Sequence, residues 1–222
     1  MANAKEIQTR MKSIQDTMKI TNAMYMISSS KMQKAKKILQ DTEPYFYNMQ
    51  AAIARILRHM PDIQHPFFSE RHLVPKDERK VGTIVITEDF MEEVPGHHKL
   101  YVLGMVGRQY FGKRDVDMDG GFHYTVQKPT MHRARLITEE IVRAFLEREL
   151  DEIHIVYTQM LNAMAMENVN MQLLPLKKAD FKVGQIPADI YQEEIVLSPS
   201  ADVLLDTMIP NYLTGVIYGC LV

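Results

Sequence analysis

The sequence predicts an α/β domain joined to one long N-terminal helix. Three observations support this: a heptad pattern in the first 40 residues, short β-branched runs alternating with helical patterns in the middle, and a helical pattern at the end. We expect a stalk helix over 1–60, an α/β domain over 61–197, and the start of a second, antiparallel stalk helix over 198–222.

The N-terminal segment has the pattern of a coiled-coil strand. Asn3 followed by Glu6 is typical of a helix start, and neither Gly nor Pro interrupts the next 37 residues. A helix from Asn3 to Thr42 would be roughly 60 Å long at about 1.5 Å per residue, so we expect it to project from the domain. Apolar and small residues recur at spacings of three and four, as a coiled-coil seam requires, at Ile7, Met11, Ile14, Met18, Thr21, Tyr25, Ser28, Met32, Ala35 and Leu39.

The same segment is basic, although the whole chain has a net charge of -2. Up to Gln40, eight Lys and Arg residues face only two acidic ones, Glu6 and Asp16, which gives a charge of +6. Such a segment can bind nucleic acid, anionic lipid or an acidic protein surface, or form a solvated helix face. Met and Ile side chains lie between the basic ones and cannot hydrogen-bond to base edges in a DNA groove, so nucleic acid is the weaker candidate. Additional apolar residues around 20–27 predict a second contact surface beside the seam.

The run from Ile20 to Met32 (ITNAMYMISSSKM), with AKEI at 4–7 and KSI at 12–14 before it, resembles the N-terminal signature of F-type ATP synthase gamma subunits. The similarity covers nearly the whole chain, continuing through His65-Pro66, 81–87, 173–176 and 205–212. The resemblance implies an antiparallel pair of terminal helices inside a ring of alternating alpha and beta subunits, with a Rossmann-like domain at the foot.

The function implied by this resemblance is that of a central rotor shaft. The shaft couples proton translocation through the membrane ring to ATP synthesis or hydrolysis on the alpha and beta subunits. The implied partners are the alpha, beta and epsilon subunits and the membrane c-ring, at the cytoplasmic face of a bacterial cell membrane. The resemblance implies no catalytic residue, cofactor or metal in the chain itself. The expected partner-contact residues are Met24, Lys19, Lys31, Ile20, Met26, Ile27 and Arg10.

The middle of the chain favours a sheet covered by helices. Strands are expected at 81–87, 99–104 and 153–157. A helix is expected after Pro129, capped by Thr130, with one apolar face made of Ala134, Ile137, Ile141 and Phe145. Its carboxylates are expected to face water rather than to form an acid/base pair: Glu139, Glu140, Glu147 and Glu149.

Residues 107–113 have the glycine spacing and the lysine of a phosphate loop. However, Arg114 stands where a magnesium-binding Ser or Thr is needed, and Tyr110 and Phe111 are bulky. We therefore expect a short amphipathic helix without a nucleotide.

No other constellation indicates chemistry. His97 and His98 lack the i, i+4 spacing of paired metal ligands and are expected in a solvated turn. His154 alternates within a strand and is expected to be a packed or edge histidine. The single Cys220 excludes an intrachain disulfide. No apolar run approaches the ~20 residues that cross a bilayer, so no direct membrane insertion is expected.

Two departures from the family pattern leave an alternative open. A helix expected after Asp89 is absent, and the return helix that starts at Ser198-Pro199, with a kink expected at Pro210, is barely begun. The chain is then either a shortened relative or part of a longer one. The alternative function is a non-rotary gamma-like paralogue, whose exposed seam binds another helix or an acidic surface.

Overall fold

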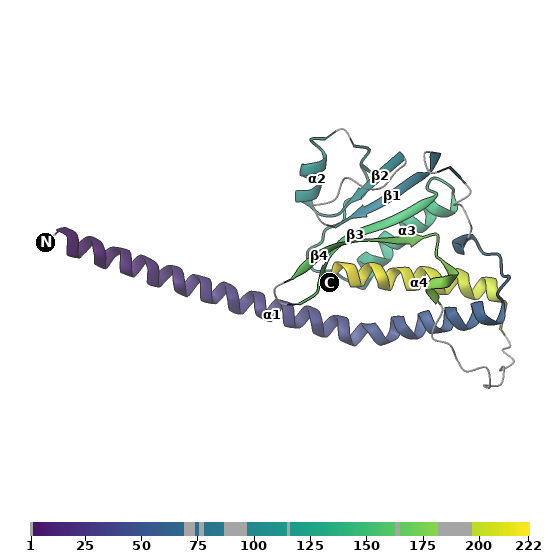
Figure 1. The fold of residues 1–222 in the computed structure, drawn as a ribbon, viewed down its shortest axis with the longest axis horizontal. Helices are drawn as coiled ribbons and strands as arrows, with labels where there is room; N and C mark the ends of the chain where they lie inside the picture. Colours follow the sequence, from purple (N-terminus) through teal and green to yellow (C-terminus); the bar gives the residue numbers. More distant parts are fainter. Residues whose placement is uncertain are drawn as a thin grey trace. The chain divides into compact units, whose positions relative to one another are not determined.

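The computed structural model describes residues 2–68, 74–75, 78–86, 97–114, 116–162, 165–181 and 197–222. These residues form two compact units (Figure 1). The first unit contains the residues up to Pro44, with Val222, and the second runs from Tyr45 to Leu221.

Helix α1 is one uninterrupted helix, Ala2–His59, of 58 residues. It begins one residue before Asn3, and it continues past the heptad pattern and Thr42 almost to the end of the segment 1–60 in which the stalk helix was expected. The extension passes through Pro44, whose ring removes one backbone hydrogen bond. Burial explains the continuation, because the turns after Pro44 place Ile53, Ala54, Ile56 and Leu57 in the core of the second unit.

The second unit contains a four-stranded sheet with the order β2-β1-β3-β4. Its strands are β1 (Lys80–Val85), β2 (His97–Val102), β3 (Glu152–Met160) and β4 (Met166–Leu174). Strand β1 is parallel to β2 and β3, and β4 is antiparallel to β3. The prediction of an α/β fold is therefore confirmed, and three strands lie within a few residues of their predicted places. Strand β4 was not predicted as a strand.

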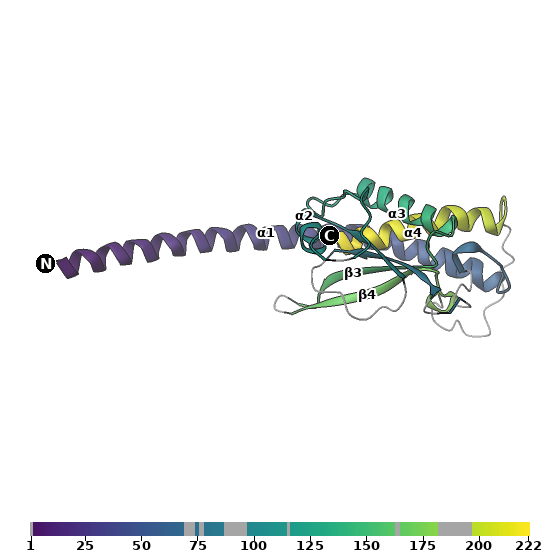
Figure 2. The ribbon, with the colours of Figure 1, turned by 90° about the horizontal axis from the view of Figure 1, so that it is seen from above.

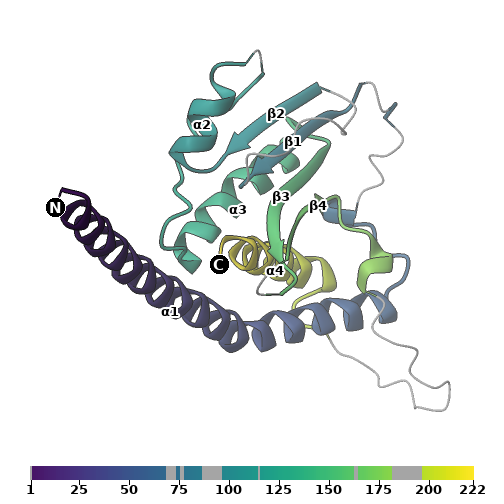
Figure 3. The same ribbon diagram turned by 60° about the vertical axis from the view of Figure 1, so that its left-hand side comes forward.

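Helices α3 (Met131–Leu146) and α4 (Ala201–Leu221) cover one face of this sheet (Figures 2 and 3). Thr130 caps α3, with its hydroxyl oxygen 3.3 Å from the backbone N of Arg133, and the four predicted apolar residues of that helix are buried. Of the four predicted solvent-facing carboxylates, three are exposed, and Glu140 is partly buried and accepts a hydrogen bond from Tyr124 at 3.3 Å.

Helix α4 begins at Ala201 rather than at Ser198-Pro199. Ser200 supplies the cap, because its hydroxyl oxygen lies 3.3 Å from the backbone N of Val203. The helix runs through Pro210 without interruption, and the Thr214 hydroxyl donates to the Pro210 carbonyl at 2.8 Å.

Two short 3-10 turns complete the core of this unit, η1 (Pro66–Phe68) and η4 (Lys178–Phe181). Phe67 is buried and stacks on Phe145 of α3, with ring centroids 6.4 Å apart. The chain after α1 is thus tied to the helices that cover the sheet.

Helices α1 and α4 meet within the second unit at Phe46 and Gly215. A Cβ atom added to Gly215 would lie 1.8 Å from the Phe46 ring, so no larger residue fits unless the ring moves. Glycine is otherwise unfavourable inside a helix, by ~1 kcal/mol relative to alanine. The close approach of the ring explains why a glycine is placed here.

We predict that Gly215→Ala lowers the free energy of unfolding by about 1–3 kcal/mol, the usual cost of overpacking, despite the better helix propensity of alanine. Urea denaturation measures this change. Gly120→Ala is the matched control, since nothing lies within 4 Å of the added Cβ. The double variant Gly215→Ala with Phe46→Leu should recover part of the loss, and a loss unchanged by Phe46→Leu would contradict the proposed clash.

Candidate partner-binding surface on helix α1

The seven predicted partner-contact residues all lie on α1, in the first unit, and all are exposed. Met24 is 64% exposed and Met26 is 70% exposed, although both are large apolar side chains. Ile20 and Ile27 are exposed in the same way. Among the described residues, no packing contact covers these four side chains.

These side chains surround the helix rather than forming one stripe. Successive residues of an α-helix are rotated by about 100°, so Met24, Tyr25, Met26 and Ile27 point in four different directions. All four are exposed. A helix that is apolar on every side is normally enclosed by other protein, whereas a helix lying on a single surface needs only one apolar face.

Charge is absent from the same stretch. Residues 20–30, here called the uncharged band, contain no Asp, Glu, Lys, Arg or His, and Lys19 and Lys31 flank them. The band spans roughly 16 Å of helix at about 1.5 Å per residue. Its Thr21 hydroxyl donates to the Thr17 carbonyl at 3.0 Å, which satisfies that donor within the helix. The band therefore combines large apolar residues with small polar ones, Ser28 to Ser30.

The basic residues near the band differ in their partners. Arg10 pairs with Glu6 at 2.8 Å, and Lys19 pairs with Asp16 at 3.2 Å, in both cases between exposed side chains. Lys31 makes no ion pair with any residue that the structure describes. Exposed pairs of this kind contribute little to stability, so a carboxylate from a partner protein can replace Glu6 or Asp16 at small cost.

The predicted coiled-coil seam forms a second exposed surface on α1. Ile7, Met11, Ile14 and Met18 are all exposed along one side of the helix. The sequence predicted this seam and the band residues. Tyr25 was predicted as a seam residue but not among the partner-contact residues. The full extent of the uncharged band was also missed, and its signal is the absence of charge between Lys19 and Lys31.

The phosphate-loop candidate is a helix in the structure. Helix α2 (Met105–Phe111) occupies most of it, and Phe111 is fully buried. The predicted short helix is present, but it is not amphipathic, because Met105 and Val106 are exposed and only Phe111 is buried. A helix leaves no open loop of backbone N–H groups here to cradle a phosphate. The described residues include no group of three or more side chains that could hold a metal ion.

His98 corrects one prediction, because it lies in strand β2, paired with Val81, rather than in a solvated turn. Its side chain is partly buried. His97 belongs to the same strand. Pairing with strand β1 makes β2 begin at the two histidines, since Lys80 pairs with His97 and Val81 with His98. The Pro and Gly residues before them had indicated a turn.

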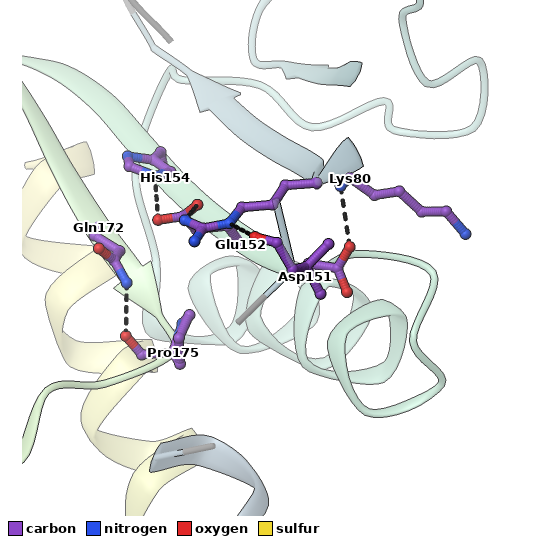
Figure 4. Close-up of polar contacts among 8 residues, drawn as sticks. Lys80, Asp151, Glu152, His154, Gln172 and Pro175 are labelled. Carbon is purple, nitrogen blue, oxygen red and sulfur yellow. Dashed lines mark hydrogen bonds and ion pairs between the residues drawn. The ribbon is translucent and has the colours of Figure 1, made fainter. Parts of the chain in front are cut away.

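His154 is a packed strand histidine, as predicted (Figure 4). Its Nδ1 lies 3.0 Å from Asn170 Oδ1, and its Nε2 lies 3.6 Å from Glu152 Oε1, while Arg79 donates to Glu152 at 3.3 Å. These contacts join β3 to β4 and to the segment before β1.

Cys220 lies near the end of α4, where burial raises the pKa of its thiol to about 12. The thiol is therefore protonated and unreactive near neutral pH. None of the described helices has the length and apolar character to cross a membrane.

A long helix with an exposed apolar surface, continuous with a mixed α/β domain, defines a class of protein that acts by presenting a helix to its partners. The chain belongs to the ATP synthase family, whose model matches residues 3–90 and 88–222. The helix predicted to be missing after Asp89 falls at the junction of these two matches, on residues outside the described ranges.

The similar curated proteins are gamma chains of that family. The ATP synthase gamma chain of Ruminiclostridium cellulolyticum is 35% identical over 99% of this chain and 80% of its own length. The gamma chain of Acetivibrio thermocellus is 34% identical over 100% of this chain and 81% of its own length. A cryo-EM structure of the central stalk and c-ring of the Tetrahymena thermophila mitochondrial ATP synthase matches with a TM-score of 0.56, at 15% identity and over 91% of each chain, and so shares the fold. These findings support an ATP synthase gamma subunit over the alternative of a non-rotary paralogue.

We predict that Ile27→Ala changes the free energy of unfolding of the isolated chain by less than about 0.5 kcal/mol, because an exposed side chain has no packing to lose. Ile53→Ala, in the same helix, should cost about 2–5 kcal/mol, since Ile53 is 0% exposed and Ile27 is 57% exposed. Urea denaturation of both variants measures the difference. Equal losses would show that Ile27 is packed within the chain and is not free for a partner.

Proposed function

We propose that this chain is the central rotor shaft of an F-type ATP synthase. It couples proton-driven rotation of a membrane ring to ATP synthesis or hydrolysis on surrounding alpha and beta subunits. The observation that supports the proposal most strongly is the uncharged band, in which Met24 to Ile27 expose large apolar side chains in every direction around the helix. The similar curated proteins are ATP synthase gamma chains.

The all-round exposure of the band favours a sleeve over a single partner helix. A partner helix would cover the seam and leave Met24, Met26 and Ile27 partly in water. A sleeve built from several subunits covers every direction at once. The ring of alternating alpha and beta subunits that the family resemblance implies has this geometry.

The lack of charge suits a shaft that turns inside its sleeve. A charge moved into an apolar contact without a partner costs several kcal/mol, and a buried ion pair holds one geometry strongly. Either would resist rotation at particular angles. Contacts of Met and Ile are non-directional, and Met adapts its shape to irregular surfaces, so their energy varies less with angle.

Coupling requires that the shaft still distinguishes the three catalytic sites. An asymmetric helix makes different contacts with each site at any angle, and each difference of about 1.4 kcal/mol changes a nucleotide affinity tenfold. Lys19 and Lys31 flank the band roughly 18 Å apart at about 1.5 Å per residue, and they are the cations best placed to meet acidic surfaces of the ring. Arg10 lies two to three turns before Lys19 and serves the same purpose.

The remaining partners follow from the family. The domain binds the epsilon subunit and the membrane c-ring, and the assembly lies at the cytoplasmic face of a bacterial cell membrane. The chain is a non-catalytic subunit of the proton-translocating enzyme. Native mass spectrometry of the purified complex tests this proposal, and failure of the chain to co-purify with the alpha, beta and epsilon subunits would contradict it.

We predict that Met24→Lys impairs coupling more than assembly, because it places an ammonium group inside the uncharged band. The ratio of protons pumped to ATP hydrolysed, measured in reconstituted vesicles, should fall while the yield of complex stays close to that of the unaltered protein. Met24→Leu, which conserves the apolar volume, is the control and should keep the ratio. A normal ratio for Met24→Lys would rule out this role for the band.

A further inference from the structure

Helix α2 exposes apolar side chains that neither the fold nor the rotor function requires. Met105 is 84% exposed and Val106 is 67% exposed, and Tyr110, one turn further along, is also exposed. These three residues, with the exposed cations Lys113 and Arg114 that follow them, are called the α2 patch.

The opposite side of α2 is firmly anchored. Phe111 is fully buried in a cluster with Val85, Leu100 and Val102. The Arg108 guanidinium donates to the carbonyls of Gly120 and Phe122, which fastens the helix to the loop beside it. The patch is therefore presented by a fixed helix rather than by a mobile loop.

The loop that receives Arg108 is itself held by Asp119. Its Oδ1 accepts from the backbone N–H groups of Gly121 and Phe122 at 2.9 and 3.0 Å, and its Oδ2 lies 2.8 Å from Lys99 Nζ. Burial opposes ionisation of this carboxyl, but the Lys99 and backbone hydrogen bonds outweigh it, so the pKa of Asp119 lies below its ordinary value. The ionised Asp119 accepts these hydrogen bonds and so stabilises the loop at 119–122 to which Arg108 of α2 is bound.

The charge of the patch is positive. Residues 104–114 contain three basic residues and no acidic one, and the first acidic residues after them are Asp115 and Asp117. Arg108 points to the carbonyls, whereas Arg114 lies over the Tyr110 ring at 4.2 Å and Lys113 is exposed. Apolar side chains beside two cations on a fixed support match the composition of a protein-binding surface with a charged rim.

We propose that the α2 patch is a second docking surface, which binds an acidic segment with apolar side chains from a neighbouring subunit of the same assembly. The exposed cations Lys113 and Arg114 favour a partner segment that carries Asp or Glu. Three apolar side chains bury too little area to hold a free protein, so the occupant is a subunit that the chain already binds elsewhere. A membrane surface is disfavoured, because lipid-binding segments carry four to eight clustered cations.

Photo-crosslinking in the assembled complex tests this inference, which goes beyond the rotor function. Val106 is replaced by p-benzoylphenylalanine in the full chain, and the complex is purified and irradiated. Glu139, exposed on α3, is replaced in the same way as the control. We expect an adduct with one subunit from position 106 alone, and mass spectrometry should place it on a peptide rich in Asp or Glu.

Charge-reversal variants test whether Lys113 and Arg114 contribute to binding. Lys113→Glu, alone and with Arg114→Glu, should reduce the adduct yield several-fold, whereas Arg135→Glu with Arg143→Glu, the same charge change on α3, should not. An assembled complex with no adduct, with a lipid adduct, or with an adduct on a basic segment would overturn the docking proposal alone. Failure of the unaltered chain to assemble would contradict both this proposal and the rotor function.

Discussion

A helix segment that is apolar on every side and carries no charge requires enclosure, and this constraint links the sequence of α1 to its function. The same helix satisfies the constraint within the chain at one end, where Ile53 and Ile56 are buried in the core of the second unit. At residues 20–30, none of the residues that the structure describes covers Met24 or Met26. In the proposed function, other subunits of the ATP synthase supply the enclosure.

The second unit holds the C-terminal part of α1 through packing that permits little adjustment. The Phe46 ring approaches Gly215 so closely that α4 has no room for a side chain there. The His65-Pro66 turn then directs Phe67 onto Phe145, so the chain leaving α1 is fixed to α3 as well. A shaft transmits torque only if its base resists twisting, and close-packed contacts of this kind resist it.

The sequence predicted what depends on local periodicity and failed where tertiary contacts decide. The heptad spacing, the places of three strands and the Thr130 cap are visible in residue order. Strand β4 was missed although residues 168–173 alternate polar and apolar side chains, because Asn is uncommon in strands and pairing with β3 defines this one. His98 joined a strand because β1 lies beside it. The identities of the band residues were predictable, but their exposure on every side required the structure.

Methionine oxidation footprinting tests the central claim most directly. At about 100° per residue, Met18, Met24 and Met26 point in three directions around α1, and all three are exposed in the chain alone. The account predicts that dilute peroxide oxidises all three rapidly in the free chain and that all three are protected in the assembled ATP synthase, with exposed Met60 as a reference within the chain. Continued rapid oxidation of Met24 or Met26 in the complex would mean that the band is not enclosed, and would contradict the account.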